Sequence, residues 1–532
     1  MQPILLNGSW TAPNEPLGAF QASNPATGET LTAHSFPVSS WNDLEALLEA
    51  GAEAARAMAD LPPEAYAEFL ESYADAIEAR TDLLVEWAHL ETGLPDSPRL
   101  RKGELPRTTN QLRQAAAAAR ERTWRQATID TASGIRSIHN PLGGPVLVFG
   151  PNNFPFAYNG IAGGDFAAAL AAGNPVIAKA HPAHPYTTTL LAEAALEALE
   201  GSRLPKAAVQ LFYNTEPELG IELVSAPQTA ALAFTGSRPG GLALKEAADK
   251  AGKPVYLEMS SVNPIFLLPG ALDERLEAIV EDVHGSCTLG GGQFCTKPGL
   301  LIVQEGASAT AFLDALQAKF EATAPTPLLT EQIPTSMGET VTRFQDAGAE
   351  LLVGGTAPEG EGFRFHPTLL KVDGEAFLAD PDSLSSEAFG PTSLVIVAKD
   401  LAEMKAIAAQ MEGNLTGSLY TATDDADEAA YAALAPIVRQ KVGRLLNDKV
   451  PTGVAVVPSM NHGGPFPATG HPGFTAVGFP AALIRFTALH CYDNVRPARL
   501  PLELQDPNPT GSMLRLIDGE WTTADIPPVL EK

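Results

Sequence analysis

The sequence predicts an α/β fold with more than one domain, and three observations support this. The chain has 532 residues, well beyond a single hydrophobic core, because domains usually hold about 100 to 200 residues. Hydrophobic residues make up 45% and charged residues 18% of it, an ordinary balance for a globular protein. From Gly144 onward, β-rich runs such as PVLVFG and PVIAKA alternate with Ala-rich helical stretches such as DFAAALAAG. This alternation is typical of βαβ units around a parallel sheet.

The region before Gly144 has a different pattern. From Trp41 to about Arg122 the sequence predicts helices, with Leu44, Leu47 and Leu48 at helical spacing and an Ala/Glu/Leu-rich stretch further on. Between Thr123 and His139, β-branched residues surround a Thr-Ala-Ser-Gly turn. We expect a β-hairpin there, projecting from the core.

A second α/β stretch follows Glu258. Its apolar runs NPIFLLP, GLLIVQ, FHPTLL and TSLVIVA are separated by helical segments such as EMKAIAAQM. No period of 20 to 50 residues indicates a repeat protein. The sequence therefore predicts a second α/β domain.

Charge and cysteine content limit the possible partners and compartment. Acidic residues outnumber basic ones by 63 to 35, and the net charge of -28 disfavours nucleic-acid and membrane partners. The N-terminus lacks the pattern of a signal peptide, and no long apolar run predicts a membrane span. Three cysteines, Cys287, Cys295 and Cys491, cannot build a disulfide framework. We expect a soluble protein of the reducing cytoplasm.

The motif GGGQFCTKPG, residues 290–299, contains the first candidate catalytic residue, Cys295. A lone cysteine is more often buried and inert. Glycines and polar neighbours make this one reachable, as a nucleophilic thiol must be. Cys287 lies eight residues earlier without the further ligands of a metal site, so we interpret it as structural and expect no metal.

Two further motifs contain polar residues after apolar strands. In YLEMSSVNP a strand ends at Glu258, where a carboxylate can face a cleft and act as a base. In VFGPNNFPFAYN the pair Asn152 and Asn153 follows a strand, and an Asn side chain can stabilise an oxyanion. Asn in a turn often serves only the turn, and we interpret Asn152 in that way.

Three weaker motifs are candidates for cofactor binding. Lys179 ends the apolar run of PVIAKAHPAHP, where it could reach a ribose or phosphate. LAFTGSRPGG predicts a strand, a turn and a helix N-terminus of the kind that attracts phosphate. SSEAFGP adds a carboxylate and an aromatic ring before a Gly-Pro turn. None has the G-x-G-x-x-G spacing, so these patterns alone do not establish dinucleotide binding.

Taken in order, GPNNFP, VIAKAHP, FTGS, LEMSSVNP, GGGQFCTKPG and SEAFGP resemble the signature motifs of the aldehyde dehydrogenase superfamily, over roughly residues 5 to 500. The segments GNLTGSLY, NHGGPFPAT and CYDNVRPARLP resemble the branch of 2-oxoglutarate semialdehyde (2,5-dioxopentanoate) dehydrogenases and related NADP-dependent fatty aldehyde dehydrogenases. The resemblance implies oxidation of an aldehyde to a carboxylic acid through a thiohemiacetal and a thioester. The implied substrate is 2-oxoglutarate semialdehyde, from sugar-acid or hydroxyproline breakdown.

The resemblance also implies roles for individual residues. Cys295 would be the nucleophile, Glu258 the general base and Asn153 the side-chain donor of the oxyanion hole. Lys179 and Ser237 would bind the adenosine half of the cofactor. Thr235, Glu387 and Phe389 would border the nicotinamide and its ribose, and Gly236 would complete the cofactor site.

The fold implied by the resemblance has three parts. Residues 1–122 and 144–257 would form a Rossmann-like NAD(P)-binding domain, and residues 258–480 an α/β catalytic domain. Residues 123–143 and 481–532 would form a small β oligomerisation extension with a C-terminal tail. By analogy we expect a homodimer or homotetramer.

Two positions depart from the family pattern. Ser260 and Ser261 stand where the superfamily often has glycines after the general base, which reduces backbone freedom, although we expect activity to survive. Pro182 stands where NAD-preferring members often carry a ribose-binding Glu. Without that carboxylate a 2′-phosphate meets less repulsion, so NADP is favoured over NAD.

Other functions remain open from the sequence. The chain could be an NADP-dependent fatty aldehyde dehydrogenase, a cofactor-free thiol hydrolase, or a binding protein that keeps the fold without activity. A hydrolase would not need Lys179, Ser237 and Glu387 together, and the retention of Cys295 with its partners argues against an inactive protein. The sequence does not identify which cation, such as Arg485, would bind a carboxylate on the substrate.

Overall fold

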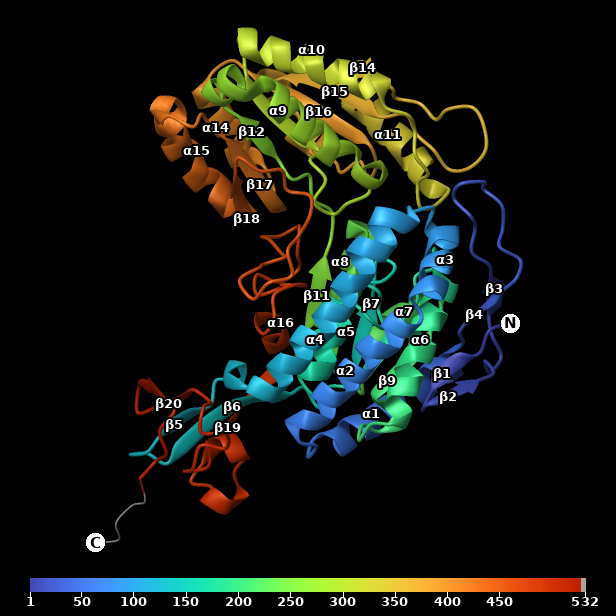
Figure 1. Cartoon of the computed structure of the whole chain (residues 1–532), viewed down its shortest axis with the longest axis vertical. Helices are drawn as coiled ribbons and strands as arrows, with labels where there is room; N and C mark the ends of the chain where they lie inside the picture. The colour runs from blue at the N-terminus through green and yellow to red at the C-terminus, as the bar shows by residue number, and fades with distance from the viewer. Residues whose placement is uncertain (528–532) are drawn as a thin grey trace.

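Two seven-stranded sheets and one five-stranded sheet organise the structure, a computed structural model that describes residues 1–527. Figure 1 shows the first large sheet in the central body, the second in the upper unit, and the five-stranded sheet in an arm below. The predicted α/β fold is confirmed. Within the described residues, none of the helices has the length and apolarity needed to cross a membrane.

The first sheet has the strand order β11-β10-β7-β8-β9-β1-β2. Its five parallel strands are β7 (Val146–Phe149), β8 (Val176–Lys179), β9 (Val209–Phe212), β10 (Ala231–Thr235) and β11 (Val255–Glu258). They match the predicted βαβ rhythm. An antiparallel pair, β1 (Ile4–Leu6) and β2 (Ser9–Thr11), extends one edge and was not predicted.

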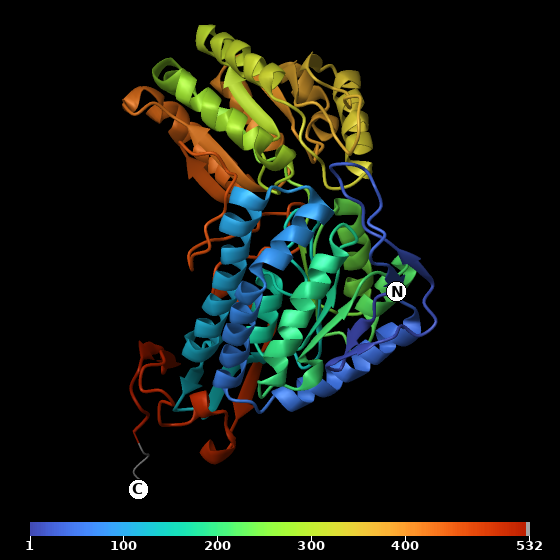
Figure 2. The same ribbon diagram turned by 45° about the vertical axis from the view of Figure 1, so that its right-hand side comes forward.

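Helices surround this sheet, and Figure 2 shows several of them side by side in front of it. The N-terminal helices fall within the predicted helical region and are α1 (Trp41–Met58), α2 (Pro63–Ala79), α3 (Thr81–Thr92) and α4 (Leu105–Glu121). Those between the strands are α5 (Gly164–Ala171), α6 (Pro185–Glu200), α7 (Pro217–Ser225) and α8 (Arg238–Lys250). A further pair of strands, β3 (Gly18–Phe20) and β4 (Phe36–Val38), forms a separate ribbon.

The second sheet has the order β14-β15-β16-β13-β12-β17-β18, and only β14 runs antiparallel to its neighbour. Its strands are β12 (Ile265–Leu267), β13 (Leu300–Gln304), β14 (Glu350–Val353), β15 (Thr368–Asp373), β16 (Thr392–Ala398), β17 (Asn414–Tyr420) and β18 (Val442–Asn447). Its helices are α9 (Pro269–Thr288), α10 (Ala307–Ala322), α11 (Gln332–Asp346), α12 (Gly374–Ala379), α13 (Pro381–Leu384), α14 (Leu401–Gln410) and α15 (Glu428–Lys441).

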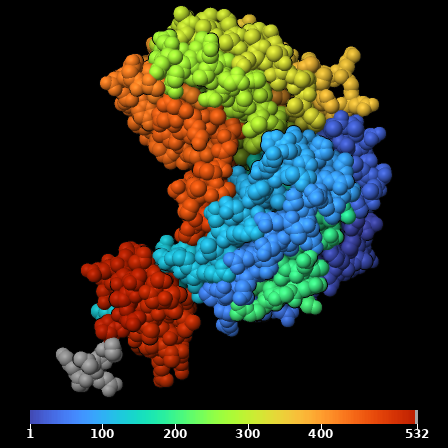
Figure 3. Space-filling model, in the orientation of Figure 1, coloured from blue at the N-terminus to red at the C-terminus, as the bar shows by residue number. Residues whose placement is uncertain are grey.

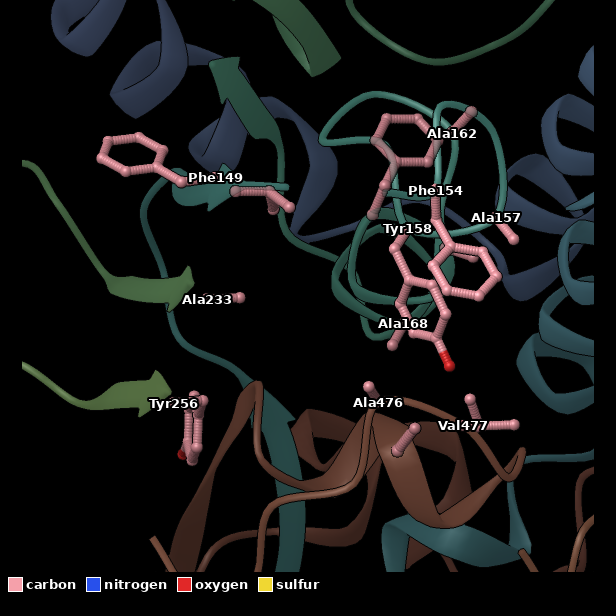
Figure 4. Packing of buried hydrophobic residues seen from close by; sticks show 14 of the residues in the cluster. Phe149, Phe154, Ala157, Tyr158, Ala162, Ala168, Ala233, Tyr256, Ala476 and Val477 are labelled. Carbon is pink, nitrogen blue, oxygen red and sulfur yellow. The ribbon is translucent and has the colours of Figure 1, made fainter. Parts of the chain in front are cut away.

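After β18 the chain returns to the central body as an irregular segment, residues 451–480, which Figure 3 shows in orange beside the junction of the two units. It is fastened to the end of β11, where the backbone N–H of Met259 donates to the carbonyl of Ala468 at 2.8 Å. Figure 4 shows Ala476 and Val477 of this segment close to Tyr158. Short α16 (Ala481–Ile484) then packs against α5. The return segment thus closes over the strand that ends in Glu258.

The arm contains the predicted hairpin, β5 (Thr128–Asp130) and β6 (Ile135–Pro141), in the order β19-β6-β5-β20-β21. C-terminal strands complete it: β19 (Thr487–Asp493), β20 (Arg515–Ile517) and β21 (Glu520–Thr522). It has its own small hydrophobic cluster, which includes Ile129, Ile138 and Leu504. Burying such a side chain contributes about 1.5–3 kcal/mol, so the arm is held by its own packing as well as by strand pairing.

Candidate active site

A cavity of about 600 Å³ lies at the carboxyl ends of four parallel strands of the first sheet. The last residues of β7, β8, β10 and β11, namely Phe149, Lys179, Thr235 and Glu258, all line it. Ligands of open α/β sheets bind at this edge because the loops after the strands meet there. All nine site residues predicted from the sequence lie on its wall: Cys295, Glu258, Asn153, Lys179, Thr235, Gly236, Ser237, Glu387 and Phe389.

The loop that holds Cys295 owes its shape to glycine. Gly290, Gly291 and Gly292 have φ between +58° and +68°, a conformation that L side chains rarely adopt. A Cβ on Gly292 would also collide with the backbone of Gly390, in the SEAFGP motif. Asn263 fixes the other side of the loop, because its Nδ2 donates to the carbonyl of Cys295 at 2.9 Å. The thiol is thereby held, half-buried, on the wall of the cavity.

A histidine that was not predicted as a site residue joins the thiol to the carboxylate. Nε2 of His462 lies 3.4 Å from Sγ of Cys295 and 3.1 Å from Oε1 of Glu258. Both His462 and Glu258 are 2% exposed. The three potential ligand atoms lie within 4.8 Å of one another, so this cluster could also hold a metal ion. His462 belongs to NHGGPFPAT, but a single histidine 167 residues from the thiol has no spacing signal of its own.

Opposing effects set the protonation of His462. Burial by itself lowers its pKa, but the charges of Glu258, Tyr158 and Cys295 outweigh that effect and raise the pKa well above the ordinary value. The imidazole therefore favours its protonated form between the carboxylate and the sulfur. A cation in contact with a thiol stabilises the thiolate, which is the nucleophilic form.

Asn153 faces the thiol loop from the segment after β7. One of its two side-chain N–H groups donates to the carbonyl of Gln293 at 2.9 Å, and its own backbone carbonyl accepts from Arg99 at 2.9 Å. The second side-chain N–H is left for another acceptor. Asn152, interpreted from the sequence as a turn residue, also lines the cavity.

The two serines that replace the usual glycines fit without strain, since neither has a positive φ. Ser261 instead uses its hydroxyl, which donates to Oδ1 of Asn263 at 2.9 Å and accepts from the backbone N–H of Leu415 at 3.0 Å. It thereby supports Asn263, the residue that holds the Cys295 loop. A glycine could not make these bonds.

The far end of the cavity suits a phosphate-containing ligand. Ser237 caps the N-terminus of α8, accepting from the backbone N–H of Gly240 at 3.4 Å, and both residues line the cavity. A helix N-terminus attracts phosphate. Burial lowers the pKa of Lys179 to about 8. Pro182 and the exposed Glu216 line the same end.

Glu387 also lines the cavity, close to Ser260 and Lys297. Burial raises its pKa to about 7, against the opposing charge of Lys297 and hydrogen bonds from Ser260 and Ser261. Lys297 itself is buried and donates from Nζ to the carbonyl of Thr392 at 2.5 Å. The residues of this cavity therefore fit a nicotinamide dinucleotide, with the Lys179 cation, the N–H groups of a helix N-terminus and small residues where phosphates and ribose would lie.

Two residues considered in the sequence lie apart from the cavity. Cys287 is fully buried in α9, and burial raises its pKa to about 11, which fits a structural role. Arg485 is paired with Asp165 and packed against Phe474 and Phe486, with its guanidinium carbon 4.7 Å and 4.5 Å from the two ring centres. Its guanidinium therefore has a structural role, in these contacts inside the fold.

The sequence profile of the aldehyde dehydrogenase family matches residues 10–458, most of the chain and nearly all of the site. The chain belongs to the aldehyde dehydrogenase family. It is 39% identical to alpha-ketoglutaric semialdehyde dehydrogenase 2 of Azospirillum brasilense, over 94% of this chain and 96% of that protein. It is 35% identical to alpha-ketoglutaric semialdehyde dehydrogenase of Acinetobacter baylyi, over 97% and 98%.

Solved structures of aldehyde dehydrogenases have the same fold as this chain. Aldehyde dehydrogenase C of Pseudomonas syringae, solved with NAD+ and octanal, superposes with a TM-score of 0.79 at 21% identity, over 94% of this chain and 98% of that one. This aldehyde dehydrogenase therefore oxidises aldehydes with NAD(P).

Proposed function

We propose that this aldehyde dehydrogenase oxidises 2-oxoglutarate semialdehyde to 2-oxoglutarate, with Cys295 as the nucleophile. The substrate assignment rests on one observation. Over nearly their whole length, two proteins named for alpha-ketoglutaric semialdehyde are 39% and 35% identical to this chain. Alpha-ketoglutaric semialdehyde is another name for 2-oxoglutarate semialdehyde. The site assignment rests on the contact of Cys295 with His462, and of His462 with Glu258.

The first step is addition of the Cys295 thiolate to the aldehyde carbon. The His462 imidazolium stabilises that thiolate before attack. The carbonyl oxygen becomes an oxyanion, which accepts hydrogen bonds from the free side-chain N–H of Asn153 and from the backbone N–H of Cys295. A single donor of this kind is typically worth about 10²–10³ in kcat.

The thiohemiacetal then loses a hydride and becomes a thioester on Cys295. When bound, NAD(P) supplies the nicotinamide that takes this hydride. Water attacks the thioester, and Glu258 accepts the proton of that water. Its Oε2 atom is buried and has no hydrogen-bond partner in residues 1–527, so this oxygen is free for the water. The thiolate leaves, and the carboxylic acid is released.

NADP is proposed as the preferred cofactor, with NAD as the second. Pro182 places no carboxylate beside Lys179, and a half-buried cation on the cavity wall is a fitting partner for a 2′-phosphate. Glu216 opposes this preference from the rim of the cavity. The remaining cofactor contacts are assigned to Thr235, Gly236, Ser237, Glu387 and Phe389, because all of them line the cavity.

We also propose that residues 1–122 and 144–257 form the cofactor domain and residues 258–480 the catalytic domain. We further propose a homodimer or homotetramer that assembles through the arm. β19 pairs only with β6 within residues 1–527, which leaves one edge of the arm's sheet open. Leu489 on that strand is 62% exposed. An open edge with exposed apolar side chains favours pairing with another chain. Light scattering tests this, and a monomer at micromolar concentration would contradict it.

The kinetic test compares 2-oxoglutarate semialdehyde, succinic semialdehyde and decanal, each with NADP and with NAD, by absorbance near 340 nm. The highest kcat/KM is expected for 2-oxoglutarate semialdehyde with NADP. A preference for decanal would make the chain a fatty aldehyde dehydrogenase and refute the substrate assignment.

A further inference from the structure

Close to Cys295 lies a group of side chains that do not line the cofactor cavity. Aromatic rings gather there: the centre of Tyr158 lies 5.7 Å from that of His462, and Phe154 lies 5.0 Å from Tyr158 and 5.6 Å from Phe294. Figure 4 shows Tyr158 beside Phe154, its hydroxyl directed toward the return segment. None of these rings lines the cavity that fits the cofactor, whereas Cys295 does, so the part of the substrate beyond its aldehyde group extends toward these rings.

Two arginines border this aromatic group. The guanidinium of Arg107, in α4, lies 5.2 Å from the centre of Tyr158 and donates to its hydroxyl at 2.8 Å. Arg444, in β18, donates to the carbonyl of Pro451 at 2.5 Å and contacts the sulfur of Met460 at 3.9 Å. Neither arginine lines the cofactor cavity.

Neither of these arginines forms an ion pair with a carboxylate in residues 1–527. Arg99 and Arg485, also close to the aromatic core, do so with Glu104 and Asp165. The chain holds 63 acidic and 35 basic residues, so carboxylates are plentiful, yet Arg107 and Arg444, both half-buried, are not paired with one in residues 1–527. Each terminal nitrogen of the Arg107 guanidinium donates one N–H, one to the Tyr158 hydroxyl and the other to the Val454 carbonyl. Within residues 1–527 the second N–H of each nitrogen is free for another acceptor.

The electrostatics agree with this geometry. Burial lowers the pKa of Arg444, and the charges of Cys295 and Tyr158 oppose that change. Burial raises the pKa of Tyr158, while Arg107 and His462 oppose the rise. The substrate side of the thiol is therefore positively charged in a protein whose net charge is -28.

We propose that Arg107 and Arg444 bind the distal carboxylate of the aldehyde substrate and so select short aldehydes that carry a carboxylate. This inference deepens the proposed function and rests on it. The guanidinium groups form charge-assisted hydrogen bonds to the carboxylate, while Phe154, Tyr158 and Phe294 enclose the carbon chain. A neutral aldehyde of the same length leaves both cations without an anion.

The test is the ratio of kcat/KM for 2-oxoglutarate semialdehyde to kcat/KM for pentanal, a five-carbon aldehyde without a carboxylate. Arg107→Gln and Arg444→Gln are each expected to lower this ratio about 10- to 100-fold, mainly through KM, because a hydrogen bond to a charged group contributes about 1.5–3 kcal/mol. Arg107→Lys should restore part of it. Arg439→Gln, at an exposed arginine near the end of α15, is the control and should keep the wild-type ratio.

The outcomes separate the two proposals. If the wild-type enzyme prefers the semialdehyde but both Gln variants keep its ratio, the arginine assignment is wrong and the proposed substrate stands. If the wild-type enzyme prefers pentanal, the substrate assignment fails and the carboxylate site fails with it. The ratio cancels a general loss of thiol reactivity, so a partly damaged variant still gives a result.

Discussion

The imidazole of His462 contacts the thiol of Cys295, with 3.4 Å between Nε2 and Sγ. The contact joins the return segment, residues 451–480, to the glycine loop before β13, and Glu258 at the end of β11 completes it at 3.1 Å. The buried histidine has a pKa raised by these neighbours, and its cation supports a thiolate.

Replacing His462 should therefore slow the alkylation of the thiol. In the wild-type enzyme we expect Cys295 to react rapidly with iodoacetamide, because the His462 cation contacts the sulfur and stabilises the nucleophilic thiolate. In His462→Gln that cation is lost, and alkylation of Cys295 at pH 6 should slow by about tenfold or more. Peptide mass spectrometry separates Cys295 from Cys287 and Cys491. His490→Gln, on the exposed arm, is the control, and identical profiles for both variants would contradict the assignment.

Cofactor binding should weaken in alkaline solution. Burial lowers the pKa of Lys179 to about 8, so its positive charge is present below that pH and lost as the pH rises through it. The KM for NADP should then rise above pH 8 more steeply than the KM for NAD, because only NADP carries the additional phosphate. Lys179→Gln should remove this difference. Parallel KM profiles for both cofactors in the wild-type enzyme would count against a 2′-phosphate contact.

Glu216 should disfavour NADP. Its exposed carboxylate lines the same end of the cavity as Lys179 and Pro182. Glu216→Gln should raise kcat/KM for NADP relative to NAD by about threefold, a modest effect because solvent screens a charge on the rim. Glu218→Gln, at an exposed residue in the first turn of α7 just after Glu216, is the matched control. An equal change for both cofactors would point to an effect on folding or closure.

Zinc should inhibit the enzyme. Cys295, His462 and Glu258 offer a sulfur, a nitrogen and an oxygen within 4.8 Å, a ligand set that Zn²⁺ accepts with one position left for water. Low micromolar ZnCl₂ should abolish turnover reversibly, and EDTA should restore it. Magnesium, which prefers oxygen ligands, should have no such effect. His462→Gln should bind Zn²⁺ at least about tenfold more weakly by calorimetry, and unchanged affinity would place the metal elsewhere.

The sequence predicts much of this site because parallel strands end at one edge of a sheet. Lys179, Thr235 and Glu258 each end an apolar run, and that rule alone brings them together. The glycines before Cys295 likewise mark a loop that only glycine can form.

The residues that the sequence did not predict reach the site by tertiary packing. His462 arrives on an irregular segment without periodicity, and Arg107 lies on a helix whose charged residues look like any solvated face. Arg485, considered from the sequence as a substrate-binding cation, instead forms an ion pair with Asp165. The antiparallel strands β1 and β2 were missed because three-residue strands give too short a pattern to recognise.

The most direct test of the central claim is to trap the covalent intermediate. Glu258→Gln removes the group proposed to take the proton of water, so the thioester should form and persist, giving one burst of reduced cofactor per active site and then kcat lower by about 10²–10⁴. After the burst with 2-oxoglutarate semialdehyde and NADP, peptide mass spectrometry should find the acyl group on Cys295. An acyl group on Cys287 or Cys491 instead, or full turnover by Cys295→Ala, would contradict the account.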